Sequence, residues 1–188
     1  MKKFLFCPVW PFSINQRFGE NKACIPIQGG VVVSCDGKNP PAGYKSLYGP
    51  LGHKGLDLAS YHGQPVYCAC AGVVASIDTD PRSGLDVRVI SEVDGKRYRH
   101  IYEHLLGYQA KVGDKIELGQ LIGWADNTGY SSGDHLHWQF EVWDGRWIAI
   151  DPLPYTEFIS AVQFAGLWRQ VKELAARLAE YLADKLHK

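Results

Sequence analysis

Short runs of apolar residues recur along residues 53–152, and turn signals separate them. The runs alternate apolar with polar positions or are rich in β-branched and aromatic residues, which is typical of β-strands. Asp94-Gly95 and Asp144-Gly145 are residue pairs that favour tight hairpin turns. Closely spaced strands joined by hairpins indicate a mainly β domain, an antiparallel β-sandwich or split barrel. The expected strands are 64–71, 72–77, 86–92, 96–103, 120–124 and 136–143.

The pattern changes at residue 156. From there to residue 188 the sequence contains no proline and one glycine, and Ala, Leu, Glu, Lys and Arg dominate. Apolar residues recur every three or four positions, which predicts a C-terminal amphipathic helix over residues 156–188. We therefore expect one domain in residues 1–155, with a core of about 14–152, followed by this helix. The apolar stripe consists of Phe164, Leu167, Val171, Leu174, Leu178, Tyr181 and Leu182.

Three roles are open for the helix. It would be able to dock on the β domain, to self-associate as a coiled coil, or to contact a membrane or carrier surface. The charges on its polar face are mixed rather than strongly cationic. Mixed charge favours packing against protein over binding to an anionic membrane.

The overall charge argues against a nucleic-acid partner. The 188 residues carry 20 acidic and 20 basic side chains, so no bulk field attracts a polyanion. No run approaches the roughly 20 apolar residues of a membrane span. Lys2 and Lys3 begin the chain like a secretory signal, but Pro8 and Pro11 interrupt the apolar run that follows. We therefore expect synthesis in the cytoplasm without a clear signal peptide.

The cysteines do not suggest a structural zinc site. There are five, and none of them form the C-x-x-C pairs of a zinc ribbon. Cys68 and Cys70 share one face of an expected strand, where we expect packed thiols rather than a disulfide. Cys24 and Cys35 flank a loop and would be able to pair in an oxidising compartment, so their redox state stays open.

Histidines carry the strongest chemical signal in the chain. His135 and His137 lie two residues apart in an expected strand, so both point to the same face, about 7 Å apart at Cα. Upstream, His53 is followed four residues later by Asp57, and His104 lies between the two motifs. Together they supply enough ligands for a zinc site with a catalytic base left over.

Zinc in a catalytic site takes three protein ligands and keeps one position open for water. His53, Asp57 and one member of the His135/His137 pair would provide two imidazoles and one carboxylate. The metal would acidify the water and polarise a carbonyl. His104 and the remaining histidine of the pair suit proton transfer, and one of them would instead be able to stabilise the oxyanion.

These motifs resemble the lysostaphin-type (LytM-like) zinc endopeptidases. The order His-x-x-x-Asp, then His-Leu after a tyrosine-containing strand, then His-Leu-His is typical of that family. The connecting sequence is also similar to the family from about Ile14 to Val142. Further matching segments are Gly55-Leu56-Asp57-Leu58-Ala59, Gly63-Gln64-Pro65-Val66, Ala71-Gly72-Val73-Val74, Val112-Gly113-Asp114, Gly119-Gln120, Gly123-Trp124, Asn127-Thr128-Gly129 and Ser132-Gly133.

The resemblance implies a role for each site residue and a LytM-type (duplicated hybrid motif) fold. It implies that His53, Asp57 and His137 bind one Zn2+ per chain. It also implies that His104 and His135 are the catalytic histidines around the water and the tetrahedral intermediate.

Two further positions follow from the same resemblance. Family members place a loop tyrosine near the oxyanion, upstream of the first zinc histidine; we assign Tyr48, with Tyr44 as the alternative. Asp134 stands where the family usually has proline before His-Leu-His. We expect this extra carboxylate to shift the pH optimum rather than to abolish activity.

The implied activity is hydrolysis of stem or cross-bridge peptides in bacterial peptidoglycan. Without an export signal, the expected setting is a bacteriophage endolysin or virion-associated lysin that causes cell-wall lysis. Two alternatives from other classes remain: a non-catalytic LytM-like module that binds the wall or activates amidases, and an oligomeric virion structural protein.

Overall fold

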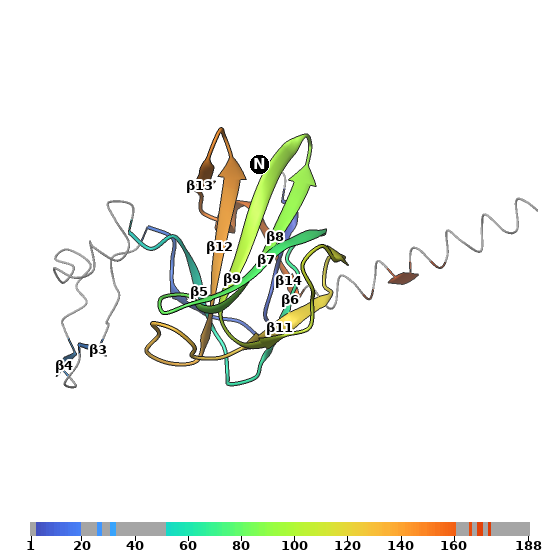
Figure 1. The fold of residues 1–188 in the computed structure, drawn as a ribbon. Coiled ribbons are helices and arrows are strands. Elements are labelled where there is room, and N and C mark those ends of the chain that lie inside the picture. Colours follow the sequence, from blue (N-terminus) through green and yellow to red (C-terminus); the bar gives the residue numbers. More distant parts are fainter. Residues whose placement is uncertain are drawn as a thin grey trace, which may run out of the picture.

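The computed structural model shows a mainly β protein (Figure 1). It describes residues 3–19, 26–27, 31–32 and 52–160, together with Gly166, Arg169, Gln170 and Glu173. The strands are β1 (Leu5–Cys7), β2 (Ile14–Gln16), β3 (Pro26–Ile27), β4 (Val31–Val32), β5 (Gly55–Ala59), β6 (Pro65–Tyr67), β7 (Gly72–Asp80), β8 (Gly84–Val93), β9 (Lys96–Tyr108), β10 (Lys115–Ile116), β11 (Leu121–Ala125), β12 (His135–Trp143), β13 (Trp147–Ala149) and β14 (Thr156–Ser160), with a 3-10 turn η2 (Leu153–Tyr155).

The main sheet is antiparallel and is organised around β9. Its strand order is β10-β7-β8-β9-β12-β5-β2, while β11 pairs with both β6 and β9, and β13 extends β12. The predicted antiparallel class is therefore confirmed. The outermost strands β10 and β2 do not pair with each other in the described chain, so the sheet does not close into a barrel.

The long strand β9 changes its partner part-way along. Its residues from Tyr98 to Glu103 pair with β12, whereas Leu105, Gly107 and Tyr108 pair with β11. The residue between these two stretches is His104. The strand β9 (Figure 1) thus leaves β12 and joins β11 at a candidate catalytic position.

The prediction that the C-terminal helix begins at residue 156 is wrong. Residues 156–160 form β14, which pairs in parallel with β1. Thr156 is 1% exposed, and its hydroxyl donates to the carbonyl of Pro152 (2.8 Å). β-Branched and aromatic residues in this segment favour extended structure, and β1 needs a strand partner for its backbone groups. Helical periodicity did not detect this non-local pairing.

Four described residues lie further along the predicted helix. Gly166, Arg169, Gln170 and Glu173 have helical conformation. The residues of its apolar stripe lie outside the described residues, so the helix and its three alternative roles stay predictions. Among the described residues, no helix is long and apolar enough to cross a membrane.

The strand β12 separates the core from the candidate site. Leu136, Trp138 and Phe140 are each at most 1% exposed and point into the core. The alternate positions His135 and His137 point to the opposite face. Since the predicted strand 136–143 nearly matches β12, the inference that both histidines share a face is confirmed.

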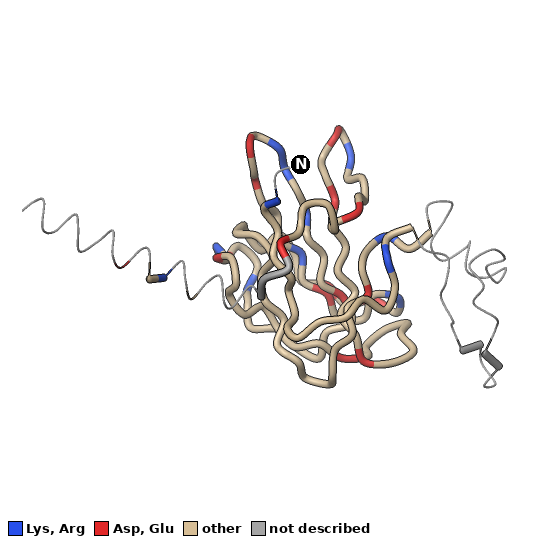
Figure 2. The backbone as a smooth tube through the Cα atoms, turned by 180° about the vertical axis from the view of Figure 1, so that it is seen from behind, with Lys and Arg blue, Asp and Glu red and all other residues tan. Residues whose placement is uncertain are grey.

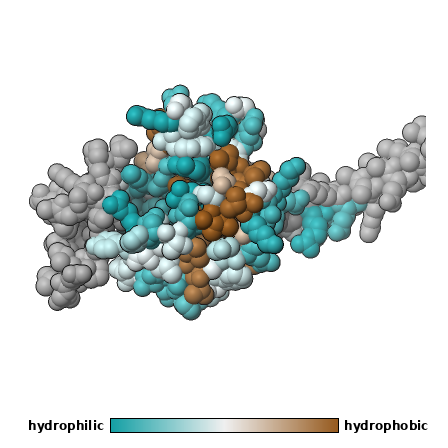
Figure 3. Space-filling view, in the orientation of Figure 1, coloured by the Kyte–Doolittle hydropathy of each residue, from teal (hydrophilic) through white to brown (hydrophobic). Residues whose placement is uncertain are grey.

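The surface outside this face is mixed in character. Figure 2 shows acidic and basic residues interspersed, with both signs at the two hairpin tips. Figure 3 shows apolar patches within a largely hydrophilic surface on the side viewed there. Exposed apolar side chains of the described residues include Val73, Leu106 and Val112.

The described cysteines are packed thiols, as predicted for Cys68 and Cys70. Both are buried and free, as is Cys7. Burial raises the pKa of the Cys68 thiol to about 12, so it is protonated and unreactive at neutral pH. The predicted alternative pairing of Cys24 with Cys35 lies outside the described residues.

The core contains one histidine without a polar partner. His100 is fully buried, it stacks against Phe140 at 5.0 Å between ring centroids, and neither of its ring nitrogens has a hydrogen-bond partner among the described residues. Burial lowers its pKa to about 3. The unfolded chain therefore binds a proton here below about pH 6.5, whereas the native state does not until about pH 3.

We predict that His100→Leu makes the domain less sensitive to acid. Stability falls as the pH drops below 6.5, and at pH 4.5 His100 should account for about 2–3 kcal/mol of that loss. Urea unfolding of both proteins at pH 7 and pH 4.5, with EDTA present, measures the difference. Equal losses of stability in the two proteins would contradict this account.

We also predict that the position of a C-terminal truncation decides stability. A chain ending after residue 160 retains β14 and serves as the reference. A chain ending after residue 155 loses the partner of β1, and its Tm should fall by about 5–10 °C for a loss of about 2–3 kcal/mol. Calorimetry of the two truncations tests this; equal Tm values would mean that β14 contributes nothing.

Candidate metal and catalytic site

The pairing of β5 with β12 brings two candidate metal ligands together. Asp57 and His137 are cross-strand partners in this antiparallel pair, so their side chains lie side by side on one face. His53 lies just before β5 and is 1% exposed. Its carbonyl accepts a hydrogen bond from the amide of Gly19 (2.7 Å), which holds the entry to β5 in place.

Three ligand atoms form a small triangle. Nε2 of His53 lies 3.0 Å from Nδ1 of His137, and Oδ1 of Asp57 lies 3.0 Å and 2.8 Å from these two nitrogens. Tetrahedral ligands at about 2.0–2.1 Å from zinc are separated by about 3.3 Å. Two imidazole nitrogens and a carboxylate oxygen converge at nearly that spacing. The residues therefore fit a zinc ion, and this group is one that could hold a metal.

The partner of each ligand suits metal binding. Nδ1 of His53 lies 3.1 Å from the carbonyl oxygen of Arg17. A carbonyl only accepts, so Nδ1 carries the proton and Nε2 presents its lone pair to the triangle. Burial opposes ionisation of Asp57, but hydrogen bonds and charges from His137 and His53 outweigh it and hold its pKa well below the usual range. The carboxylate is therefore ionised.

Carboxylates also act on His137. Burial by itself lowers the pKa of this imidazole, but the charges of Glu103 and Asp57 and the hydrogen bond with Asp57 raise it to about 9. Glu103 is the cross-strand partner of His137 on β9. An imidazole next to two carboxylates holds a cation strongly, whether that cation is a proton or a metal.

His104 reaches the site through an unusual backbone conformation. Its φ is +62°, in the left-handed region that few residues other than glycine adopt. Simple alternation along β9 would place it on the face opposite Glu103. The change of strand partner instead brings its ring to 4.7 Å from the ring of His135 and 6.1 Å from that of His137. This strained residue at the site is consistent with a functional constraint.

Both accessory histidines are oriented by backbone carbonyls. Nδ1 of His104 lies 2.8 Å from the carbonyl of Thr128, and Nδ1 of His135 lies 2.8 Å from that of Gly133. In each ring Nδ1 is therefore a donor, so the neutral form of the ring carries its lone pair on Nε2. Burial, with the charges of His137 and His135, lowers the pKa of His104 to about 4, so this ring is neutral at pH 7.

His135 lies next to the metal triangle. Its Nε2 is 3.6 Å from Oδ1 of Asp57, and the hydroxyl of Ser131 lies 3.1 Å from its Nδ1. Because the ring of His104 lies 4.7 Å from that of His135, both accessory imidazoles lie beside the triangle.

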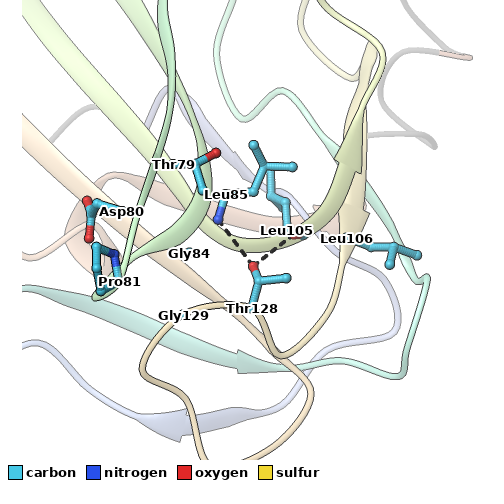
Figure 4. Close-up of a pocket in the computed structure, with 9 residues that line it drawn as sticks. All are labelled: Thr79, Asp80, Pro81, Gly84, Leu85, Leu105, Leu106, Thr128 and Gly129. Carbon is cyan, nitrogen blue, oxygen red and sulfur yellow. Dashed lines mark hydrogen bonds between the residues drawn. The ribbon is translucent and has the colours of Figure 1, made fainter.

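Thr128 anchors the loop that supports His104. Figure 4 shows its hydroxyl accepting from the amide of Leu85 (3.2 Å) and donating to the carbonyl of Leu105 (2.9 Å). The same residues border a pocket of about 560 Å³ whose lining is largely apolar and includes Leu106. This loop is therefore fixed to β8 and β9 at the point where it orients the imidazole.

A second group of potential ligands is more exposed. His62, Asp126 and Asp134 place ligand atoms close together, but Nδ1 of His62 is already paired with Asp126 at 2.7 Å. This group lies at the exposed rim of the site, unlike the buried triangle. Asp134, the residue in place of the family proline, belongs to this rim rather than to the buried triangle.

The structure brings together the five described residues that the sequence singled out: His53, Asp57, His104, His135 and His137. Tyr48 and its alternative Tyr44 lie outside the described residues. Sequence reasoning missed the carbonyls that orient the rings, because every residue type carries a carbonyl. It also missed Glu103, although the Glu-His pair at 103–104 was a readable signal.

Residue 55 has to be glycine because β5 and β12 approach closely there, which leaves no room for a Cβ. A Cβ at this position would lie 2.6 Å from the carbonyl oxygen of Trp138 and 2.9 Å from Nε2 of His137. Both atoms belong to the strand that carries the metal ligand. Any side chain here would therefore push β12, or the His137 ring, away from β5.

We predict that Gly55→Ala disrupts the triangle. The domain should lose about 1–3 kcal/mol of stability through overpacking, and its affinity for zinc should fall at least tenfold. Urea unfolding and titration against a chromophoric zinc chelator measure the two effects. Gly63→Ala is the comparison, since a Cβ there has nothing within 4 Å, although its positive φ carries a cost of its own. Unchanged zinc affinity in Gly55→Ala would contradict the close approach.

Comparison with known proteins agrees with this geometry. The model of Peptidase family M23 matches residues 51–152, which hold all five site residues. Lysostaphin from Staphylococcus simulans is 37% identical over 122 residues, covering 60% of this chain and 24% of that protein. Peptidoglycan DD-endopeptidase ShyA from Vibrio cholerae is 40% identical over 90 residues, covering 48% of this chain and 20% of that protein. The chain thus spans about a quarter or less of the length of these relatives.

Solved structures show the same fold. The catalytic domain of lysostaphin from Staphylococcus simulans superposes with a TM-score of 0.55 at 28% identity, covering 77% of this chain and 91% of that one. A zinc-containing peptidase from Vibrio cholerae gives 0.57 at 26% identity, with 81% and 40% covered. The family match extends over more than half of the chain, and the resemblance seen in the sequence is confirmed: this chain belongs to peptidase family M23.

Proposed function

We propose that this protein is a zinc-dependent endopeptidase that hydrolyses peptide bonds in the stem or cross-bridge peptides of peptidoglycan. The observation that carries the proposal is the triangle of His53, Asp57 and His137 with two further imidazoles beside it. Membership of peptidase family M23 supports the hydrolytic class. The similarity to lysostaphin and to a peptidoglycan DD-endopeptidase supports the wall peptide as substrate.

In this proposal His53, Asp57 and His137 hold one zinc ion per chain. When bound there, zinc supplies a Lewis acid that acidifies water and polarises a peptide carbonyl. The protein supplies the buried ligand set, the ionised carboxylate and the orientation of each imidazole. The similar zinc-containing peptidase from Vibrio cholerae supports the choice of metal.

His104 and His135 are the proposed proton-transfer groups. Each donates its Nδ1–H to a backbone carbonyl, so the neutral form of each ring presents the lone pair of Nε2 to the site. One of these nitrogens takes the proton of the attacking water. The ring that accepts it becomes a donor and can protonate the amine that leaves when the peptide C–N bond breaks.

Two finer parts of the proposal rest on the family resemblance. Tyr48, with Tyr44 as the alternative, would donate a hydrogen bond to the oxyanion. The setting as a phage-type lysin likewise stays a prediction.

We predict that purified protein contains stoichiometric zinc and cleaves isolated peptidoglycan. His135→Ala should lower the rate at least about 100-fold, because proton transfer contributes about 10²–10⁴-fold, while zinc content remains. Asp57→Asn should lose the zinc as well as the activity. The matched control is Gln109→Ala, an exposed residue outside the site, which should retain activity within about twofold. Mass spectrometry of released peptides identifies the bond, and metal analysis gives the zinc content.

Three outcomes would contradict the proposal. A wild-type protein without zinc would refute the metal site and favour a non-catalytic wall-binding or amidase-activating module. Undiminished hydrolysis by His135→Ala would refute the catalytic assignment. Release of sugars rather than peptides would refute the proposal that the protein cleaves peptide bonds.

A further inference from the structure

The site face of β12 continues past His137 as a row of polar side chains. Gln139 and Glu141 follow at two-residue spacing, so they point to the same face as the candidate metal ligand. Arg99 on β9 is the cross-strand partner of Glu141. Glu141 is 6% exposed, which is unusual for a carboxylate. A buried charge at this place needs partners of defined polarity.

Both Arg99 and Gln139 donate hydrogen bonds to the carboxylate of Glu141. Nε of Arg99 donates to Oε2 of Glu141 (2.6 Å), and the Arg99 guanidinium makes a second contact to the same oxygen (2.5 Å). Nε2 of Gln139 donates to Oε1 of Glu141 (2.6 Å). Arginine only donates and a carboxylate only accepts, so the amide of Gln139 has one possible orientation. Its oxygen is left to accept a hydrogen bond from elsewhere.

His137 is the next residue along this face. Nδ1 of its ring is turned to Asp57 and His53, so Nε2 is the nitrogen left for another partner. Nε2 lies 2.9 Å from the position that a Cβ of Gly55 would take, and Gly55 is the cross-strand partner of Gln139, so Nε2 faces the Gln139 position. Gln139 is also one cause of the raised pKa of His137. A proton on Nε2 leaves the lone pair of Nδ1 for the metal position.

We propose that Arg99, Glu141 and Gln139 form a positioning chain that sets the tautomer and orientation of His137 as a metal ligand through Nδ1. The inference rests on the proposed metal site and deepens it. A ligand imidazole that donates its other N–H to a fixed acceptor is both oriented and made more basic, and loss of such a partner typically costs about 10–100-fold in metal affinity. Gln139 acts through His137, and Arg99 acts through Glu141.

The order of donors and acceptors in the positioning chain distinguishes this role from simple packing. In Glu141→Gln, Arg99 still requires an oxygen, so the new amide turns its NH2 group towards Gln139. Gln139 must then flip, and it presents its own NH2 to His137 instead of its oxygen. A change of nearly equal shape, made away from the metal, thus removes the acceptor of Nε2–H.

The opposite single change also breaks the polarity. In Gln139→Glu the new carboxylate still accepts from His137, but it faces the carboxylate of Glu141 without a proton between them. Combining the two changes restores an alternating order. In the double variant Arg99 donates to the amide oxygen introduced at position 141. The NH2 group of that amide donates to the carboxylate at position 139, which accepts from His137.

The experiment measures zinc affinity by competition with a chromophoric chelator at pH 7.5. We expect Gln139→Met, Glu141→Gln and Gln139→Glu each to bind zinc about 10–100-fold more weakly than wild type. The double variant Gln139→Glu/Glu141→Gln should recover to within about threefold of wild type. Gln109→Met, an exposed glutamine outside the site, is the matched control and should bind like wild type. Thermal unfolding of the metal-free proteins shows that each variant is folded.

The outcomes separate this inference from the proposed function. Wild-type protein that binds no zinc would overturn both. Wild-type protein that binds zinc, with Gln139→Met and Glu141→Gln within twofold of it, would overturn the positioning chain alone. A double variant no better than its single variants would also overturn it, because the restored alternation of donors and acceptors should restore the zinc affinity.

Discussion

The pairing of β5 with β12 at Asp57 and His137 is the contact on which the rest of the site depends. Side chains in a sheet alternate faces, so a slip of one residue would move every ligand of one strand to the core face. The core prevents that slip, since Leu136, Trp138 and Phe140 are fully packed on the other side of β12. Hydrophobic burial thus determines the register, and the register places a carboxylate and an imidazole 2.8 Å apart.

Hydrogen-bond partners then decide what each imidazole can do. His53, His104 and His135 all donate Nδ1–H to a backbone carbonyl and present Nε2 to the site. His137 is the exception, since it presents Nδ1 and turns Nε2 towards Gln139. Four imidazoles, three of them oriented by backbone carbonyls, thus gather in a single small volume, where we propose that two bind the metal and two transfer protons.

The change of partner along β9 supplies the remaining geometry. At His104 the strand leaves β12 and joins β11, and the residue takes a positive φ. Without that turn its side chain would point to the face opposite Glu103, away from the reacting atoms. The amide of Asp126 donates to the carbonyl of His104 (3.0 Å), so the loop that supports the ring also holds the bend.

Much of this was readable from the sequence because it depends on local periodicity and residue type. Alternating runs predicted the antiparallel β class, and the strand 136–143 matched β12 closely enough to place His135 and His137 on one face. The motifs around His53, Asp57 and His104 identified the remaining described site residues. Helical periodicity, by contrast, extended the predicted C-terminal helix over residues that form β14.

The sequence by itself thus singled out the side chains of the proposed site and predicted that one strand presents two of them together. The tertiary structure decided which nitrogen of each ring faces the metal position, on which face His104 lies, and that Gln139 and Glu141 support His137. The physical reason is that these features depend on non-local strand pairing, on backbone carbonyls common to all residues and on one strained φ. None of these leaves a periodic or compositional signal in the chain.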